Sequence, residues 1–264
     1  MSILRGLPAA RRQVRTGMSR HGISMIRNDV STGGHGITVS EITRPMTSWP
    51  FRLDRTHQRL SDDAGRTFDL AMRSWVHAPE VRGEGVDATT ACAWLQRESG
   101  APCRVPIGVI GPREATAAQM SDAAATGRGL ATMGLAILCG GREGVMHAAS
   151  QGAAAADGVT IGLLPDADPD LGNPHLTFVI ATGIGEARNA LIARASLCLV
   201  AIGNSHGTLS EVALARHFGK LVIGLAGAAD VPGVCHVQDV GAALDLIARC
   251  VLDPAGTAVH GRRP

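Results

Sequence analysis

Two glycine-containing turns in the sequence could hold a phosphate group, because each follows an apolar, strand-like run and opens a helix. The first is residues 139–146, with the sequence CGGREGVM, and the second is residues 203–211, with the sequence GNSHGTLSE. Glycine lets the backbone approach an anion closely, and the N–H groups and dipole at the start of a helix favour negative charge. Any tight turn between a strand and a helix also favours glycine, so both interpretations stay open.

The second turn also carries polar side chains that could contact a ligand. Ser205 and Thr208 offer hydroxyl groups, and Asn204 tolerates left-handed backbone geometry. Thr208 and Glu211 have the spacing of a capping box, in which Glu211 would bond back to the turn. Glu211 therefore has a structural role and a chemical role open to it, and the two can coexist.

An arginine lies in the first turn of a third predicted helix, residues 186–195, which follows Gly183 and Gly185. A cation is unfavourable there because the helix dipole already places positive charge at the helix start. Arg188 therefore needs a partner. That partner is either a phosphate or carboxylate ligand, or an acid of the chain such as Glu186.

Strand-like and helical segments alternate from residue 105 to residue 251. The strand-like runs are continuously apolar, which is typical of a parallel sheet covered by helices on both faces. We therefore predict an α/β fold with a doubly wound, Rossmann-like parallel sheet that binds its ligand where the strand order reverses. The predicted strands are 105–110, 135–139, 159–164, 176–181, 197–202 and 221–225, and the predicted helices are 116–133, 143–156, 186–195, 208–218 and 240–251.

The N-terminal hundred residues do not follow this alternation. Residues 1–55 contain six arginines and no acid up to residue 27, and turn-forming residues follow. This composition predicts a disordered extension or a start codon assigned too early, with a transit peptide as the alternative, so we expect residues 1–55 to be dispensable. Residues 56–104 predict a short helical N-terminal segment that packs on the core, because two apolar stripes have helical spacing. The stripes are Phe68, Ala71, Met72 and Trp75, and Ala88, Ala91, Cys92 and Leu95.

Composition excludes several classes of protein. The chain has 264 residues, of which 45% are hydrophobic and 18% charged, so it can bury a core. Its longest apolar runs, such as 197–202, are far shorter than the roughly 20 residues of a membrane helix. A net charge of +2 is too small to imply a nucleic-acid partner. The six cysteines show no zinc-site spacing, which predicts a cytoplasmic protein without a dedicated metal site.

Together the three glycine-containing segments resemble a known family. Gly-Gly-x-x-Gly-x-Met at 140–146, Arg188 early in a helix, and Gly207-Thr208-x-x-Glu211 follow the order seen in LOG-like (SLOG) Rossmann proteins, formerly described as lysine decarboxylase-like. The resemblance covers residues 105–252. The Gly-Glu-Ala-Arg-Asn segment at 185–189 is similar to the bacterial branch of unassigned role, which is related to cytokinin riboside 5′-monophosphate phosphoribohydrolases.

The resemblance implies a site for a nucleotide or a phosphorylated small molecule. In the enzymes of the family, a Pro-Gly-Gly-x-Gly-Thr-x-x-Glu loop holds the phosphate of a nucleoside 5′-monophosphate, which is hydrolysed to free base and ribose 5-phosphate without a metal or organic cofactor. Arg188 and Glu211 are then the implied catalytic residues, since a carboxylate stabilises positive charge that develops on the sugar. The implied ligand-binding residues are Gly111, Gly140, Gly141, Gly144, Met146, Asn189, Gly203, Asn204, Ser205, His206, Gly207 and Thr208.

The sequence departs from the enzyme pattern in the second turn. Gly203 replaces the proline of the loop, and Asn204 and Ser205 replace the two glycines that follow, which places side chains where a phosphate would lie. An acid for the leaving base is not evident from the sequence either. The aspartates of the loop 165–174 have no feature that distinguishes them from residues of a solvated turn.

The family also contains proteins that bind without catalysis, including carriers of the molybdenum cofactor, which is a pterin phosphate, and proposed nucleotide sensors. A non-catalytic binder or carrier is therefore the alternative to a hydrolase. The resemblance further implies a homodimer, with the Ala-rich helices at 148–156 and 187–195 as its interface. A DNA-associated role has no support from the charge distribution of residues 105–264.

Overall fold

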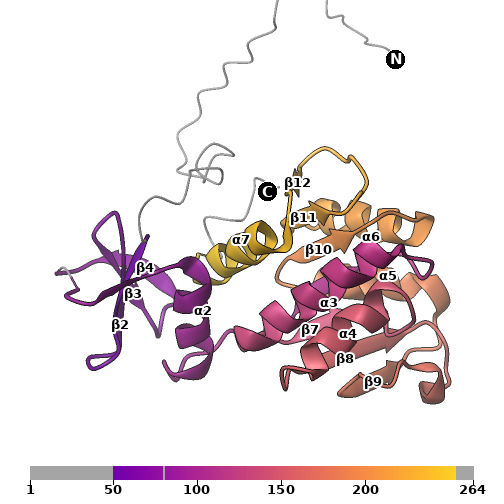
Figure 1. The fold of residues 1–264 in the computed structure, drawn as a ribbon, viewed down its shortest axis with the longest axis horizontal. Helices are drawn as coiled ribbons and strands as arrows, with labels where there is room; N and C mark the ends of the chain where they lie inside the picture. The colour runs from indigo at the N-terminus through magenta and orange to yellow at the C-terminus, as the bar shows by residue number, and fades with distance from the viewer. Residues whose placement is uncertain (1–49, 80, 254–264) are drawn as a thin grey trace, which may run out of the picture. The chain divides into compact units, whose positions relative to one another are not determined.

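The computed structural model describes residues 50–79 and 81–253, and most of these residues belong to a seven-stranded sheet with its helices (Figure 1). The strands lie in the order β12-β11-β10-β6-β7-β8-β9, and each neighbouring pair is parallel. This confirms the predicted doubly wound, Rossmann-like fold. The bounds are β6 Ile107–Ile110, β7 Ile137–Cys139, β8 Thr160–Leu164, β9 Phe178–Ala181, β10 Leu199–Ile202, β11 Val222–Leu225 and β12 Val234–His236, the last of which the sequence did not indicate.

Five helices follow these strands, with two short 3₁₀ helices between β8 and α5. The helices are α3 Ala117–Thr132, α4 Val145–Ala154, α5 Asn189–Ala195, α6 His206–His217 and α7 Val240–Leu252, and the 3₁₀ helices are η1 Pro169–Leu171 and η2 Gly185–Arg188. On β10, Val200 and Ile202 pack in a cluster with α3, α4 and α7, whereas Leu199 and Ala201 pack in a cluster with α5 and α6. Both faces of the sheet are thus buried, which explains its continuously apolar strands. Within the described residues, no helix has the length and apolar character needed to cross a membrane.

The chain changes direction across the sheet between β6 and β10. From β6 it continues to β7, β8 and β9 on one side, and it then returns to β10 and proceeds to β11 and β12 on the other side. The loops that leave the carboxyl ends of β6 and β10 therefore diverge. Open α/β sheets bind their ligands in the crevice at such a switch point.

The small residues of α4 pack against α3 of the same chain. A Cβ atom added to Gly127 would lie 2.0 Å from the Ala149 oxygen, and one added to Gly152 would lie 1.9 Å from the Ala124 oxygen. The two helices can approach this closely only because these positions lack side chains. Ala149 and Ala153 are fully buried in this contact region. The Ala-rich stretch 148–156, which was predicted to form a dimer interface, therefore packs largely against other parts of the same chain.

The N-terminal segment differs from its prediction. Where a first helix was predicted, the structure has an antiparallel sheet in the order β4-β3-β2-β1-β5, and a helix follows it. The second predicted helix is confirmed as α2, which begins at the cap residue Asp87. The bounds are β1 Phe51–Asp54, β2 Arg59–Asp62, β3 Arg66–Asp69, β4 Ser74–His77, β5 Glu84–Val86 and α2 Ala88–Arg97.

A helix was predicted here because two aromatic residues lie seven positions apart. Phe68 on β3 lies opposite Trp75 on β4, and their ring centroids are 5.2 Å apart. The Asp69 carboxylate accepts hydrogen bonds from the backbone N–H groups of Ala71 and Met72, which closes the hairpin between the strands. An apolar pair at i and i+7 therefore meets across a hairpin here, although the same spacing also places two residues on one helical face.

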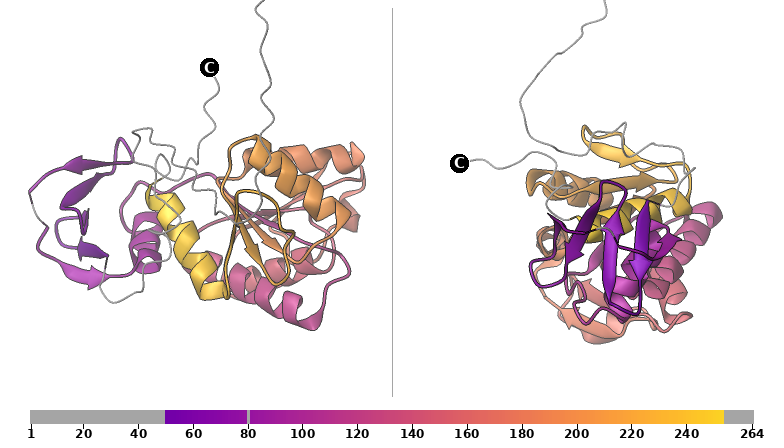
Figure 2. Two further views of the ribbon diagram at one scale, coloured as in Figure 1. Left: turned by 90° about the horizontal axis from the view of Figure 1, so that it is seen from above. Right: turned by 90° about the vertical axis from the view of Figure 1, so that its left-hand side faces the viewer.

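The boundary predicted at residue 55 is also wrong. Residues 1–49 lie outside the described residues, but β1 pairs with both β2 and β5, and Phe51 and Leu53 on it are buried. The side chains of β1 share one core cluster with α2 and α7, and these two helices contact each other (Figure 2). Arg97 at the end of α2 also donates hydrogen bonds to the carbonyl oxygens of Ala131 and Thr132. Strand β1 is therefore part of the folded protein.

Two truncations test this boundary. A chain that begins at Met46 retains β1, and we expect it to keep the stability of the full chain. A chain that begins at Thr56 loses the buried side chains of Phe51 and Leu53, and we expect its free energy of unfolding to fall by about 3–6 kcal/mol. Urea denaturation followed by circular dichroism measures both. Equal midpoints for the two chains would show that β1 contributes nothing.

Candidate functional site

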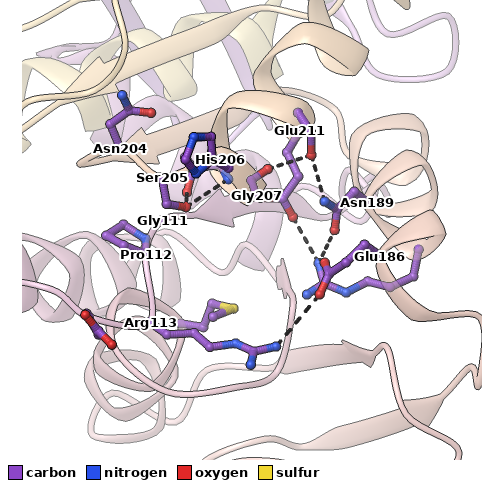
Figure 3. A pocket seen from close by; sticks show the side chains of 15 residues that line it. Gly111, Pro112, Arg113, Glu186, Asn189, Asn204, Ser205, His206, Gly207 and Glu211 are labelled. Carbon is purple, nitrogen blue, oxygen red and sulfur yellow. Dashed lines mark hydrogen bonds and ion pairs between the residues drawn. The ribbon is translucent and has the colours of Figure 1, made fainter.

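A pocket with a volume of about 720 Å³ lies at the switch point between β6 and β10. Its walls come from the loop after β6, from η2 and the start of α5, and from the first turns of α6 (Figure 3). The position is the one predicted from the strand pattern. The predicted site residues that line it are Gly111, Met146, Arg188, Asn189, Asn204, Ser205, His206, Gly207, Thr208 and Glu211.

Ser205, rather than Thr208, caps helix α6. The Ser205 hydroxyl accepts a hydrogen bond from the Thr208 N–H at 3.1 Å, and the two hydroxyl oxygens are 2.8 Å apart. The predicted capping box between Thr208 and Glu211 is therefore wrong, since Thr208 already lies in the first turn. The N–H groups of His206 and Gly207 belong to the same turn and have no partner within the helix, so this end of the pocket favours an anion.

Glu211 instead forms a buried ion pair with Arg188. The Arg188 Nη1 donates to Glu211 Oε1 at 3.0 Å and to Asn189 Oδ1 at 2.7 Å. Asn189 is fixed in turn because its Nδ2 donates to the Ser210 hydroxyl at 2.8 Å. Of the two partners considered for Arg188, the structure thus has an acid of the chain, but one that lies 23 positions away. Glu186 lies 3.9 Å from Arg113 instead.

Burial governs the protonation of this pair. The Glu211 residue is 6% exposed, and burial raises the pKa of its carboxyl group to about 7, although the neighbouring Arg188 acts in the opposite direction. The Arg188 Nε is also buried and has no hydrogen-bond partner among the described residues. The pair therefore offers an unused donor and a carboxyl group that titrates near neutral pH.

The glycines of the first turn, Gly140, Gly141 and Gly144, do not line the pocket. A Cβ atom on Gly140 would lie 2.7 Å from Arg188 Nη2, and one on Gly144 would lie 2.2 Å from the Arg113 carbonyl oxygen. These two glycines therefore make room for residues that do line the pocket. Gly203 lies behind the wall as well, against Gln119.

Several residues of the pocket were missed by the sequence analysis. Arg113 and Glu114 lie in the loop that follows β6, and the rule that ligands bind at strand ends could have found them. Glu186 was considered only as a partner of Arg188, and Ser210 was given no role although it lies in the 203–211 segment. The remaining missed residue is Pro112.

The aspartates of the loop after β8 do not supply the acid that the sequence lacked. Asp166 pairs with Arg142, and Asp168 caps η1 by accepting a hydrogen bond from the Asp170 N–H at 2.9 Å. None of the three lines the pocket. In the part of the chain that the structure describes, no group of three or more His, Cys, Asp and Glu residues is placed to hold a metal ion.

Comparisons with known proteins identify a matching family and several similar structures. A model of the SLOG cluster4 family matches residues 104–244. The chain is similar to the molybdenum cofactor binding protein of Rippkaea orientalis, with 36% identity and a TM-score of 0.54 over 56% of this chain and 98% of that one. It is also similar to the Moco carrier protein of Chlamydomonas reinhardtii, with 37% identity and a TM-score of 0.52 over 57% of this chain and 99% of that one.

A third relative matches in amino-acid sequence. An uncharacterized protein of Archaeoglobus fulgidus is 38% identical over 119 residues, which is 45% of this chain and 78% of that protein. The family match includes every residue of the pocket, and it begins after β1 to β5 and α2. The antiparallel sheet and α2 are thus additions to the part that the family model describes.

The buried carboxyl group makes stability depend on pH. The folded state holds the Glu211 proton with a pKa of about 7, above the ordinary value of 4.5, so it binds more protons than the unfolded chain between these values. Stability from this group is fully present below pH 4.5 and is lost as the pH rises through 7. From pH 4.5 to above pH 7, we expect the free energy of unfolding of wild type to fall by about 3 kcal/mol relative to that of Glu211→Gln.

Urea denaturation at several pH values from 5 to 8 measures this difference. The exposed Glu143, which does not line the pocket, provides the matched control Glu143→Gln, and we expect it to follow wild type. Identical pH profiles for wild type and Glu211→Gln would contradict the raised pKa.

Proposed function

The chain belongs to the SLOG cluster4 family, and from this membership and its switch-point pocket we propose that it binds a phosphorylated small molecule, as a carrier or binder of a pterin phosphate such as the molybdenum cofactor. The observation that carries this proposal is the meeting of the α6 N-terminus with the buried Arg188 in one pocket. Two similar proteins, each spanned almost completely by this chain, are named for binding or carrying that cofactor.

The chemistry of the walls supports such a ligand. The first turn of α6 supplies N–H groups and the Ser205 hydroxyl for a phosphate, and Arg188 supplies a cation. Pro112 and Met146 supply apolar surface for a flat ring, and Asn204 supplies a donor and an acceptor for ring heteroatoms. A volume of about 720 Å³ lies in the range of pockets that bind small molecules.

The Arg188–Glu211 pair favours a second candidate, hydrolysis of a nucleoside 5′-monophosphate. Cleavage of the N-glycosidic bond passes through a state with positive charge on the sugar, and an ionised Glu211 at the pocket base would stabilise that charge. Arg188 would hold the ligand. The acid for the leaving base is not one of the three loop aspartates, because none of them lines the pocket.

Two variants, measured at pH 7, separate the candidates. We expect Arg188→Ala to weaken binding of a phosphorylated ligand by about 10- to 100-fold, since a charge-assisted hydrogen bond contributes about 1.5–3 kcal/mol. If the protein is a hydrolase, Glu211→Gln should lower turnover about 100-fold or more while affinity changes little.

The assay uses a panel of 5′-monophosphates and pterin phosphates, with ribose 5-phosphate release and calorimetric affinity as readouts. Arg188→Lys controls for folding because it keeps the charge. Binding through Arg188 without turnover on any member supports a carrier and contradicts the hydrolase. Unchanged affinity in Arg188→Ala contradicts both candidates.

We also propose that the protein is a homodimer, and that the edge strand β9 is its interface. Phe178, Val179 and Ile180 on β9 are 58%, 38% and 47% exposed, and Leu171 and Ile184 beside it are 46% and 50% exposed. Residues 176–184 contain no charge and no proline, the features by which edge strands usually avoid pairing. A second copy presents the same uncharged strand, so a two-fold contact is self-complementary.

Light scattering tests this interface. We expect wild type to have about twice the 27.3 kDa mass of one chain, and Ile180→Lys to be a monomer because a lysine on the edge opposes pairing. Met120→Lys, at an exposed apolar residue of α3, is the matched control and should remain a dimer. A monomeric wild type at micromolar concentration would contradict the proposal.

A further inference from the structure

The cation at the base of the pocket is already neutralised by the chain itself. The Arg188 and Glu211 side chains are 3.0 Å apart and only 5% and 8% exposed, so neither charge is solvated by bulk water. The Arg188 Nη1 already donates to Glu211 and Asn189, and the buried Nε has no hydrogen-bond partner among the described residues. An anion that engages Arg188 must therefore come close to the Glu211 carboxylate.

We propose that the anionic group of the ligand binds at this pair together with one proton, which Glu211 takes up from solvent. This inference rests on the proposed function and concerns the same pocket. An approaching anion repels the carboxylate and thereby favours its protonated form. The new O–H bond removes the repulsion, leaves the charge of Arg188 to the ligand, and provides a donor for an oxygen of the anion. No bond of the ligand breaks in this step.

Among the described residues, Arg188 is the one cation that forms an ion pair with Glu211. When Arg188 binds the anion of the ligand, the other titratable groups near Glu211 would not neutralise its carboxylate. Each of them is acidic, exposed to solvent or uncharged. The titratable groups that face it within the described residues are Arg188 and Glu186 of η2, Cys139 of β7, Arg113 and Glu114 of the pocket wall after β6, and His206 of its own helix.

Protonation of Glu211 requires little free energy and does not displace Arg188. Without ligand the pKa of Glu211 is already about 7, so protonation near neutral pH costs little free energy. Arg188 remains in place when Glu211 becomes neutral, because its Nη1 also donates to Asn189 Oδ1 at 2.7 Å, and Ser210 fixes Asn189. Protonation thus changes the charge of the pocket while the guanidinium keeps its position.

Isothermal titration calorimetry with 5′-AMP at pH 8, in two buffers of different ionisation enthalpy, measures the proton uptake. At this pH the phosphate is a dianion, since the second pKa of a phosphate monoester is about 6. We expect wild type to take up roughly one proton and its affinity to fall up to about tenfold per pH unit above 7. Glu211→Gln should take up none, bind about tenfold tighter than wild type at pH 8, and keep its affinity constant from pH 7 to 9.

Two control variants locate the proton. Glu143→Gln lies outside the pocket and should match wild type, and His206→Asn should still take up one proton at pH 8 whatever its affinity. Binding of 5′-AMP without proton uptake, or equal uptake in wild type and Glu211→Gln, overturns this inference and leaves the proposed function intact. A protein that binds neither 5′-AMP nor sulfate contradicts the anion site, and therefore both.

Discussion

The buried contact between Arg188 and Glu211 is the interaction on which the candidate site depends. Two charges lie 3.0 Å apart at the base of a pocket, and three features of the fold hold them there. The 3₁₀ helix η2 carries Arg188, and Gly140 leaves space for its guanidinium because glycine has no side chain. Ser205 caps the start of α6, so the Glu211 side chain is not needed as a cap and can pair with Arg188. Because a buried pair of charges is costly when one partner is missing, the pair also constrains how this part of the sheet can fold.

The strand order explains why the pair lies in a pocket at all. Loops that leave β6 and β10 diverge at the switch point, and the crevice between them receives the start of α6 from one side and η2 from the other. Every parallel sheet with this reversal has such a crevice. What distinguishes this one is that a helix N-terminus, which attracts anions, lies beside a carboxyl group with a pKa of about 7. Binding of an anion and protonation of the chain are therefore linked in one place.

Most of the sheet could be predicted from the sequence because a strand buried on both faces must be apolar throughout, as β10 is. The pocket position followed from the same pattern. The partner of Arg188 could not be predicted, since the contact joins residues 23 positions apart on different elements. Nor could the N-terminal sheet, because Phe68 and Trp75 have a spacing that suits a helix as well as a hairpin. The glycines of the 139–146 turn show a further limit, since a sequence does not reveal whether a glycine faces a ligand or makes room for a side chain.

The central claim is that a phosphorylated small molecule binds at the switch-point pocket through Arg188. Native mass spectrometry of the protein as purified from cells, for wild type and Arg188→Ala in parallel, tests it most directly. The account predicts an additional mass on wild type that denaturation releases as a phosphorus-containing compound, and loss of that mass in Arg188→Ala while the variant remains folded. The same bound mass in both proteins, or a released compound without phosphorus, would contradict it.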